Sequence, residues 1–316
     1  MSQVVEPVRK AKRRGFHRAL FRERPQAAVG IIIVGLLALV AIFAPLLSPY
    51  GPKVQSCPLH AAPSAQHWLG CDAAGFDMLT LLMHGLRISL IVGLAAAFVA
   101  IVIGGAVGIT SGYFGGRTDT SLMAVANFFL VVPEVPLMVV LASLLGRSLG
   151  IIIFVIGILL WAGTSRIIRA QVKSTRERVY VKRARSVGAG NTRIIVRHIV
   201  PQVAPLILAN AVLIVAVAIF DETFLSFLGL GDPNSISLGK LIESAFEEQA
   251  TLRGEWWTIV PPGLLVTFLI LGCTLYGQAL EDTLNPRLKV SFLSPRSFRI
   301  RRGVAEEKQA VLEAGS

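Results

Sequence analysis

The sequence predicts an all-α polytopic membrane protein with six transmembrane helices. Its 316 residues are 53% hydrophobic and only 16% charged, whereas soluble domains are about 25% charged. The apolar residues gather in stretches of about 20, the length that crosses the hydrocarbon core of a bilayer. The formal net charge of +12 is concentrated between these stretches and towards the two ends of the chain, as is typical of cytoplasmic regions of membrane proteins.

Six apolar stretches are long enough to span a membrane. They are residues 29–47, 88–110, 121–146, 148–165, 202–220 and 258–280. The first exceeds the apolar core of a secretory signal peptide, about 7–15 residues, and is therefore predicted to be a retained anchor. The third contains one charge, Glu134, and a short turn at Arg147 joins it to the fourth as an antiparallel hairpin. Gly104, Gly105 and Gly108 are predicted to let helices pack closely.

Basic residues predict the orientation of the chain. Ten Lys or Arg residues accompany a single acid, Glu177, between Arg166 and Arg197, and both ends of the chain are rich in Lys and Arg. Because six spans place these three regions on one side, the positive-inside rule predicts that the loop and both termini are cytoplasmic. This topology explains the net charge, so no nucleic-acid binding is expected. The predicted parts are a basic tail (1–28), a first transmembrane helix (29–48), an extracytoplasmic loop (49–86), a five-helix core (87–285) with a cytoplasmic loop at 166–201, and a cytoplasmic C-terminal tail (286–316).

The chain carries no pattern typical of an enzyme or of a metal centre. Its three cysteines lack zinc-like spacing and its five histidines are scattered. It has no phosphate-binding glycine loop with its lysine and no nucleophile elbow. We therefore expect no catalytic residue, no metal and no bound cofactor. The main alternative to a subunit of a larger transporter is a stand-alone secondary transporter or channel, which commonly carries ionisable groups near mid-membrane.

The basic segment in the middle of the chain is predicted to form a helix-turn-helix elbow. Residues 164–187 have a helical pattern that breaks at Gly188–Gly190. Thr192 suits the N-cap of a second short helix that ends near Val200, and Pro201 suits the start of the fifth span. An ordinary solvated loop would explain the positive charge, but it would not explain glycine and proline at these offsets.

This segment, YVKRARSVGAGNTRIIVRHIVPQ, resembles the signature loop of the permease subunits of ABC importers. The loop reads Glu-Ala-Ala, three residues, Gly, nine or more residues, then an apolar residue, any residue, Leu and Pro. Four positions match this pattern: Ala184, Gly188, Ile199 and Pro201. Three positions depart from it: Lys182 in place of Glu, Arg183 in place of Ala, and Val200 in place of Leu.

Four further stretches resemble the dipeptide, oligopeptide and nickel permease family in order and spacing. They are HWLGCDAAGFDMLTLLMHGLRISL (67–90), SGYFGGRTDTSLM (111–123), DETFLSFLGLG (221–231) and LEDTLNPRL (280–288). The resemblance extends over roughly residues 22–288. The first helix followed by a long loop is similar to the C-type member of the permease pair.

The resemblance implies a type I ABC importer permease fold in the bacterial cytoplasmic membrane, surrounded by lipid. It implies three kinds of partner protein: a homologous second permease, two cytosolic ABC ATPase domains that bind ATP and Mg²⁺, and an extracytoplasmic peptide-binding protein. The implied substrates are dipeptides or oligopeptides. The elbow would dock on an ATPase, and Gly188 would permit its sharp turn. The residues expected to carry this coupling are Tyr180, Arg183, Ala184, Arg185, Gly188, Arg193 and Pro201.

Two smaller groups of residues are also candidates for function. Glu134, Asp221 and Glu222 are expected to line the translocation path or a gate; the alternatives are a protonated or paired Glu134 and an acidic pair capped by interfacial water. Cys57 and Cys71 lie in the first predicted outer loop, on the side where thiols are oxidised. We expect a disulfide between them, with two free thiols as the alternative.

Overall fold

The computed structural model describes residues 25–284. Most of the two predicted basic tails lies outside these residues. The helices are α2 (Pro25–Leu47), α3 (Met78–Phe114), α4 (Gly116–Val131), α5 (Glu134–Leu145), α6 (Leu149–Arg176), α7 (Val179–Ser186), α8 (Asn191–Ile194), a π-helical turn (Ile195–Ile199), α9 (Val200–Phe227), α10 (Leu238–Glu247) and α11 (Trp256–Leu284). Over this part of the chain there is no β-strand, only two isolated bridges in the loop that precedes α3.

Six apolar spans can be identified in the described residues, as the sequence predicts. Five are single helical runs: α2, α3, α6, the run that ends with α9, and α11. The sixth is a bent pair, α4 and α5, whose axes meet at 90°. The span predicted over 121–146 is therefore bent rather than straight, because Val132 is extended (φ −71°, ψ 131°) and Pro133 and Pro136 have no N–H to continue the helical ladder.

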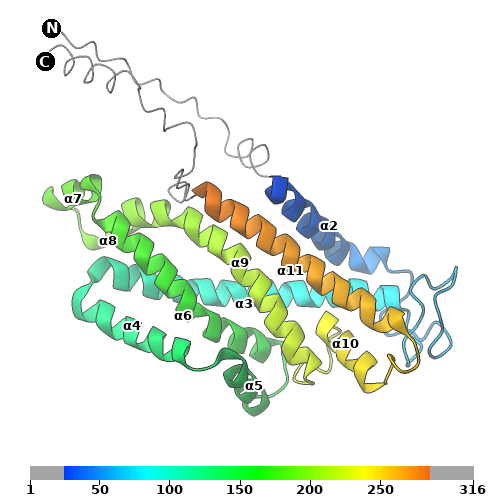
Figure 1. Cartoon of the computed structure of the whole chain (residues 1–316). Helices are drawn as coiled ribbons and strands as arrows, with labels where there is room; N and C mark the ends of the chain where they lie inside the picture. The colour runs from blue at the N-terminus through cyan, green and yellow to red at the C-terminus, as the bar shows by residue number, and fades with distance from the viewer. Residues whose placement is uncertain (1–24, 285–316) are drawn as a thin grey trace, which may run out of the picture. The chain divides into compact units, whose positions relative to one another are not determined.

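The helices pack around α3, which runs the length of the bundle (Figure 1). α6 lies along α3, and α11 packs against α9 and α2. A Cβ on Gly104 or Gly108 would lie 2.7 Å from a backbone carbonyl oxygen of α6, so these two glycines permit the close approach of α3 and α6, as predicted. At Gly105 the nearest atom is 3.9 Å away, so the predicted packing role does not apply to it.

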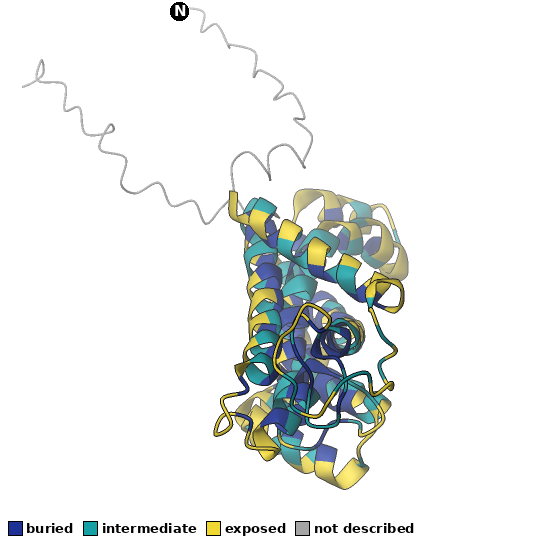
Figure 2. Ribbon diagram, turned by 90° about the vertical axis from the view of Figure 1, so that its right-hand side faces the viewer, coloured by how far each residue is buried: buried dark blue, intermediate teal, exposed yellow. Residues whose placement is uncertain are grey.

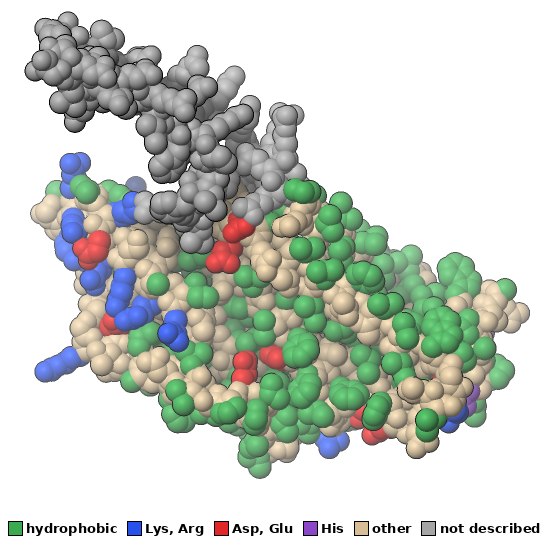
Figure 3. Space-filling view, in the orientation of Figure 1, with side chains coloured by type: hydrophobic (Ala, Val, Ile, Leu, Met, Phe, Trp, Pro, Cys, Tyr) green, Lys and Arg blue, Asp and Glu red, His purple; other side chains and the backbone are tan. Residues whose placement is uncertain are grey.

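The outer surfaces of the helices are apolar. Leu36, Ile42, Leu46 and Phe98 are each more than 60% exposed, and Figure 2 shows exposed residues on the outward faces of the helices and buried residues between them. In Figure 3 hydrophobic side chains cover much of the visible face, while Lys and Arg gather at the end where α7 and α8 lie in Figure 1. This distribution suits helices that contact lipid, with one charged end outside it.

Candidate functional site

The predicted elbow lies between α6 and α9. α6 ends at Arg176, and the N–H groups of Glu177 and Arg178 both donate to the carbonyl of Thr175. Arg178 is extended (φ −65°, ψ 142°), so the chain turns before α7 begins. The predicted uninterrupted helix over 164–187 is therefore wrong.

Glu177, the one acidic residue of this basic segment, is neutralised by its neighbours. Its carboxylate lies 3.3 Å from Arg176 Nε and 3.0 Å from Lys182 Nζ. The hydrogen bond from Lys182 lowers the pKa of Glu177 below its ordinary value, and Arg176 adds to this effect. The carboxylate thus stays ionised and paired at neutral pH, and the surrounding surface remains strongly basic.

Gly188 makes the turn between α7 and α8. Its φ is +83°, a conformation that suits glycine and is costly for residues with a side chain. The N–H of Gly188 donates to the carbonyl of Arg185 (3.0 Å), and the N–H of Ala189 donates to that of Ala184 (3.1 Å), which closes the end of α7. A Cβ on Gly188 would meet no atom of residues 25–284 within 4 Å, its chain neighbours aside. Within this chain the backbone conformation, and not a lack of room, requires glycine.

α8 continues directly into the fifth span. Residues Asn191–Phe227 form one helical run that contains the π-helical turn. Because Pro201 has no N–H, one helical hydrogen bond is missing there, and the N–H of Val200 donates five residues back, to the first carbonyl of the π-helical turn. The predicted separate helix that ends near Val200 is therefore wrong. Thr192, the predicted N-cap, lies inside α8.

The elbow has a buried apolar underside and an exposed basic surface. Val181, Ile194 and Ile199 are fully buried and pack against Ile168 and Val172 of α6. Ala184 is half-buried beside them. The exposed residues include Tyr180, Arg183, Arg185, Val187 and Arg193. The elbow therefore packs against α6 through its apolar side, and its positively charged side chains are exposed.

A partly buried ion-pair cluster next to the elbow was not apparent from the sequence pattern. Asp119 of α4 is 8% exposed and pairs with Arg169 and Lys173 of α6, with Lys173 Nζ 2.6 Å from Asp119 Oδ2. Two of the basic residues that the charge pattern assigns to a solvated loop thus connect two helices. The acid that follows the paired glycines in SGYFGGRTD is the sequence signal that could have indicated this contact.

The neighbouring acids Asp221 and Glu222 have different environments. Glu222 is 2% exposed, and its carboxylate accepts hydrogen bonds of 2.8 Å from Ser89 of α3 and from Ser226. The Ser89 hydroxyl also accepts from the N–H of Leu238, the first residue of α10. Glu222 therefore joins α3, α9 and α10, and Ser89 is a participant that the sequence did not reveal.

Asp221 does not share the hydrogen bonds of Glu222. It is 4% exposed, and its Oδ2 atom is buried with no hydrogen-bond partner in the described part of the chain. The charged group that acts on it is Glu134, an exposed residue at the start of α5, beside the break after α4. Among residues 25–284, neither carboxylate forms an ion pair with a basic side chain. The three predicted acids thus fall into two groups. The carboxylate of Glu222 is held by hydrogen bonds, whereas Asp221 and Glu134 are two acids without a basic partner in the described residues.

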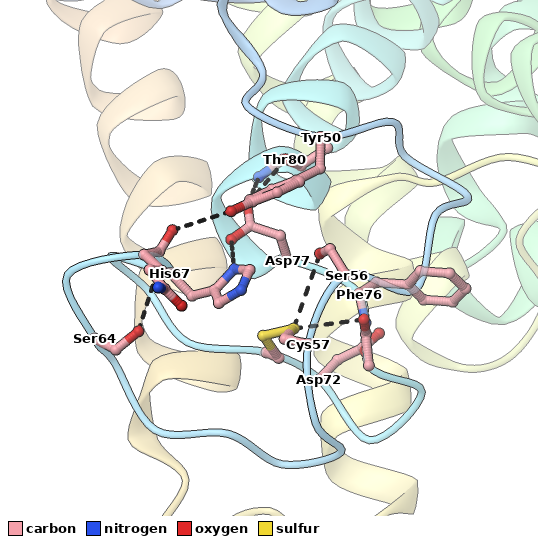
Figure 4. Close-up of a disulfide and its surroundings, with 12 residues drawn as sticks. Tyr50, Ser56, Cys57, Ser64, His67, Asp72, Phe76, Asp77 and Thr80 are labelled. Atoms are coloured by element: carbon pink, nitrogen blue, oxygen red, sulfur yellow. Dashed lines mark hydrogen bonds and ion pairs between the residues drawn. A yellow bond between two sulfur atoms is a disulfide. The ribbon is translucent and has the colours of Figure 1, made fainter.

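A disulfide holds the loop between α2 and α3. Cys57 and Cys71 are bonded to each other, with their Cα atoms 6.5 Å apart (Figure 4). The carbonyl of Cys71 accepts a hydrogen bond of 3.2 Å from Trp257 Nε1, and His60 Nδ1 lies 3.1 Å from Glu255 Oε1. Both contacts attach this loop to the start of α11.

His67 lies beside the disulfide and supports the start of α3. Its Nδ1 is 2.9 Å from Asp77 Oδ1, and the other oxygen of Asp77 caps α3 by accepting from the N–H of Thr80 (Figure 4). The ligand atoms of Cys57, His67 and Cys71 lie within 4.8 Å of one another. Two sulfurs that are bonded to each other offer no thiolate, the form of cysteine that binds metals, so this trio does not form a thiolate metal site while the disulfide is intact.

The disulfide can be tested directly by mass spectrometry. Protein alkylated in SDS without prior reduction is expected to yield a linked peptide pair that contains Cys57 and Cys71, while Cys273, the free cysteine of α11, is alkylated. Cys57→Ser with Cys71→Ser should lower the free energy of unfolding by about 3 kcal/mol, because the bond closes a short loop. Alkylation of both loop cysteines before reduction would contradict the pairing.

Two family models match the chain. The model described as "Binding-protein-dependent transport system inner membrane component" matches residues 104–290, and the model described as "N-terminal TM domain of oligopeptide transport permease C" matches residues 17–63. The chain belongs to the inner membrane component family of binding-protein-dependent transport systems. This membership confirms the type I ABC importer permease fold and the resemblance to the C-type permease, and it makes the chain a multi-pass protein of the inner membrane.

Several characterised relatives are similar to nearly the whole chain. The oligopeptide transport system permease protein OppC of Bacillus subtilis is 35% identical over 271 residues, 85% of this chain and 88% of that protein. The dipeptide transport system permease protein DppC of the same organism is 34% identical over 265 residues, 83% of this chain and 82% of that protein. The OppC protein of Mycobacterium tuberculosis is 36% identical over 270 residues, 83% of this chain and 91% of that protein.

Proposed function

We propose that the chain is a permease subunit of an ATP-driven ABC importer that takes up dipeptides or oligopeptides. The observation that carries this proposal is the similarity, over more than four fifths of the chain, to permease proteins of oligopeptide and dipeptide transport systems. In the proposed complex a homologous second permease completes the translocation path, and an extracytoplasmic binding protein delivers the peptide. ATP and Mg²⁺ are bound by two cytosolic ATPase domains, and this chain contributes no catalytic group.

The elbow is the proposed docking site for an ATPase domain. Its exposed arginines, Arg183, Arg185 and Arg193, suit acidic groups on a partner, because a guanidinium pairs well with carboxylates. Its apolar underside packs against α6, and its second half is continuous with α9. A displacement of the elbow by the ATPase would therefore move two transmembrane helices, which is the mechanical requirement for coupling.

Proteoliposomes that contain the complete complex test this function. Accumulation of a labelled dipeptide is expected only when ATP is present on the ATPase side and the binding protein on the other. Comparing how dipeptides, longer peptides and nickel chelates stimulate ATP hydrolysis would identify the substrate class. Uptake that runs on an ion gradient without ATP would instead indicate a secondary transporter and overturn the proposal.

We also propose that Glu134 and Asp221 line the translocation path and meet the amino group of a peptide. A charged carboxylate inside a membrane is costly unless it is paired or faces water, and these two have no basic partner within residues 25–284. The helix break at Pro133 also leaves backbone carbonyls without donors beside Glu134. A cationic group in transit would be attracted by all of these oxygens.

Replacing Glu134 by glutamine is expected to reduce peptide uptake about tenfold, the effect of losing one hydrogen bond to a charged group. The measurement is uptake into proteoliposomes at saturating binding protein, with Glu247→Gln, an exposed acid of α10, as the matched control. Unchanged uptake and specificity would remove Glu134 from the path. Dissociation of the second permease from the Glu134→Gln variant would indicate a pairing role instead and would equally count against the proposal.

A further inference from the structure

One residue of α3, Tyr113, contacts both helices of the elbow, α7 and α8, and the end of α6 that precedes them. It is 2% exposed, and its hydroxyl donates a hydrogen bond of 2.9 Å to Oδ1 of Asn191, the first residue of α8. Its carbonyl accepts a bond of 2.9 Å from Arg176 Nη1 at the end of α6. The guanidinium of Arg185, in α7, lies over its ring, 5.6 Å from the centroid.

These contacts connect the elbow to a helix that is distant from it in sequence. The Tyr113 ring packs in the same apolar cluster as Val181 of α7 and Ile194 of α8. The chain reaches α7 only after α4, α5 and α6, so nothing in the local sequence joins the elbow to α3. Tyr113 supplies this connection through a ring, a hydroxyl and a carbonyl at one point.

The same helix also takes part in a polar junction that lies far from Tyr113 along its axis. α3 has 37 residues, about 55 Å of helix at 1.5 Å per residue. Twenty-four positions before Tyr113, the hydroxyl of Ser89 bonds both Glu222 of α9 and the N–H of Leu238 in α10. A continuous helix packed along α6 can transmit a shift at Tyr113 to Ser89.

We propose that Tyr113 is a positioning residue that links the ATPase-docking elbow to α3, so that a displacement of the elbow moves α3 and the Ser89–Glu222–Leu238 junction. This inference rests on the proposed import function. It predicts that the Tyr113–Asn191 hydrogen bond affects how many peptides are moved per ATP hydrolysed, more than it affects the assembly of the complex.

The test uses the complete complex with Tyr113→Phe, which removes only the hydroxyl. The ATPases are expected to stay bound, and the number of peptides taken up per ATP is expected to fall about fivefold, the effect of one ordinary hydrogen bond. Asn191→Ala should give the same fall, and the double variant no further fall, because the two changes break one bond. Asn191→Asp retains the acceptor and should restore most of the ratio. Tyr276→Phe, the same chemical change on α11, is the matched control.

Hydrogen–deuterium exchange of the elbow amides provides a readout that does not depend on transport. Tyr113→Phe should accelerate exchange over residues 179–194 compared with wild type and with Tyr276→Phe. If the wild-type complex shows no ATP-driven uptake, the proposed function fails, whatever the exchange shows. If wild-type uptake is normal and Tyr113→Phe leaves the peptide-to-ATP ratio unchanged, the positioning role is overturned, and faster exchange alone would then mark Tyr113 as a purely structural contact.

Discussion

Replacing Gly188 by valine is expected to abolish most peptide uptake while the protein still inserts in the membrane. The turn between α7 and α8 needs φ = +83°, and a β-branched side chain is strained there by about 1–3 kcal/mol. The chain would relieve this strain by changing the turn, which would misplace the exposed arginines of α7 relative to α8. Since each 1.4 kcal/mol corresponds to a factor of ten, we expect uptake and peptide-stimulated ATP hydrolysis to fall about tenfold or more.

The matched control is Gly188→Asn. Asparagine tolerates a left-handed conformation better than most residues with a side chain, and a Cβ at this position meets no atom within 4 Å in the part of the chain that the structure describes. Gly188→Asn should therefore retain most of the uptake. Uptake by Gly188→Val at the wild-type rate, with the ATPases bound in a pull-down from the same membranes, would show that the shape of this turn is not needed for coupling.

Replacing Glu222 by alanine is expected to destabilise the protein severely. The carboxylate is 2% exposed and accepts from Ser89 and Ser226, so its removal leaves two buried hydroxyls without their acceptor and creates a cavity. The loss of a buried polar network of this kind typically costs about 3–5 kcal/mol. We expect a large fall in the thermal midpoint of the purified protein, measured by fluorescence-detected size exclusion. We also expect poor assembly with the second permease.

Asp221→Asn provides the comparison within the same acidic pair. Its Oδ2 atom has no hydrogen-bond partner among the described residues, so the amide breaks no bond seen there, and the thermal midpoint should change little. Peptide transport should nevertheless fall if Asp221 lines the path. Equal losses of stability in Asp221→Asn and Glu222→Ala would contradict the division of the pair into a structural and a path-lining residue.

Transmembrane helices are the part of this structure that is predictable from composition alone. A bilayer offers the backbone no hydrogen-bonding solvent, so about 20 consecutive apolar residues must form a helix wherever they occur. The spans at 29–47, 88–110 and 258–280 accordingly lie inside α2, α3 and α11. The stretch 121–146 is also apolar enough to span, but it bends between α4 and α5. Hydropathy measures only the apolar character of this span, and the bend follows from Pro133 and Pro136, which lack N–H donors.

The sequence by itself determined the membrane class, the number of spans and the position of the basic elbow, because these depend on the local pattern of apolar and charged residues. Only the tertiary structure decided that Glu222 is bonded and Asp221 is not, that Cys57 meets Cys71, and that Tyr113 contacts the elbow. Glu222 and Ser89 are 133 residues apart, and Tyr113 and Asn191 are 78 apart. Such contacts depend on how helices pack against one another, and a periodic pattern within one helix does not specify which side chain of another helix lies opposite it.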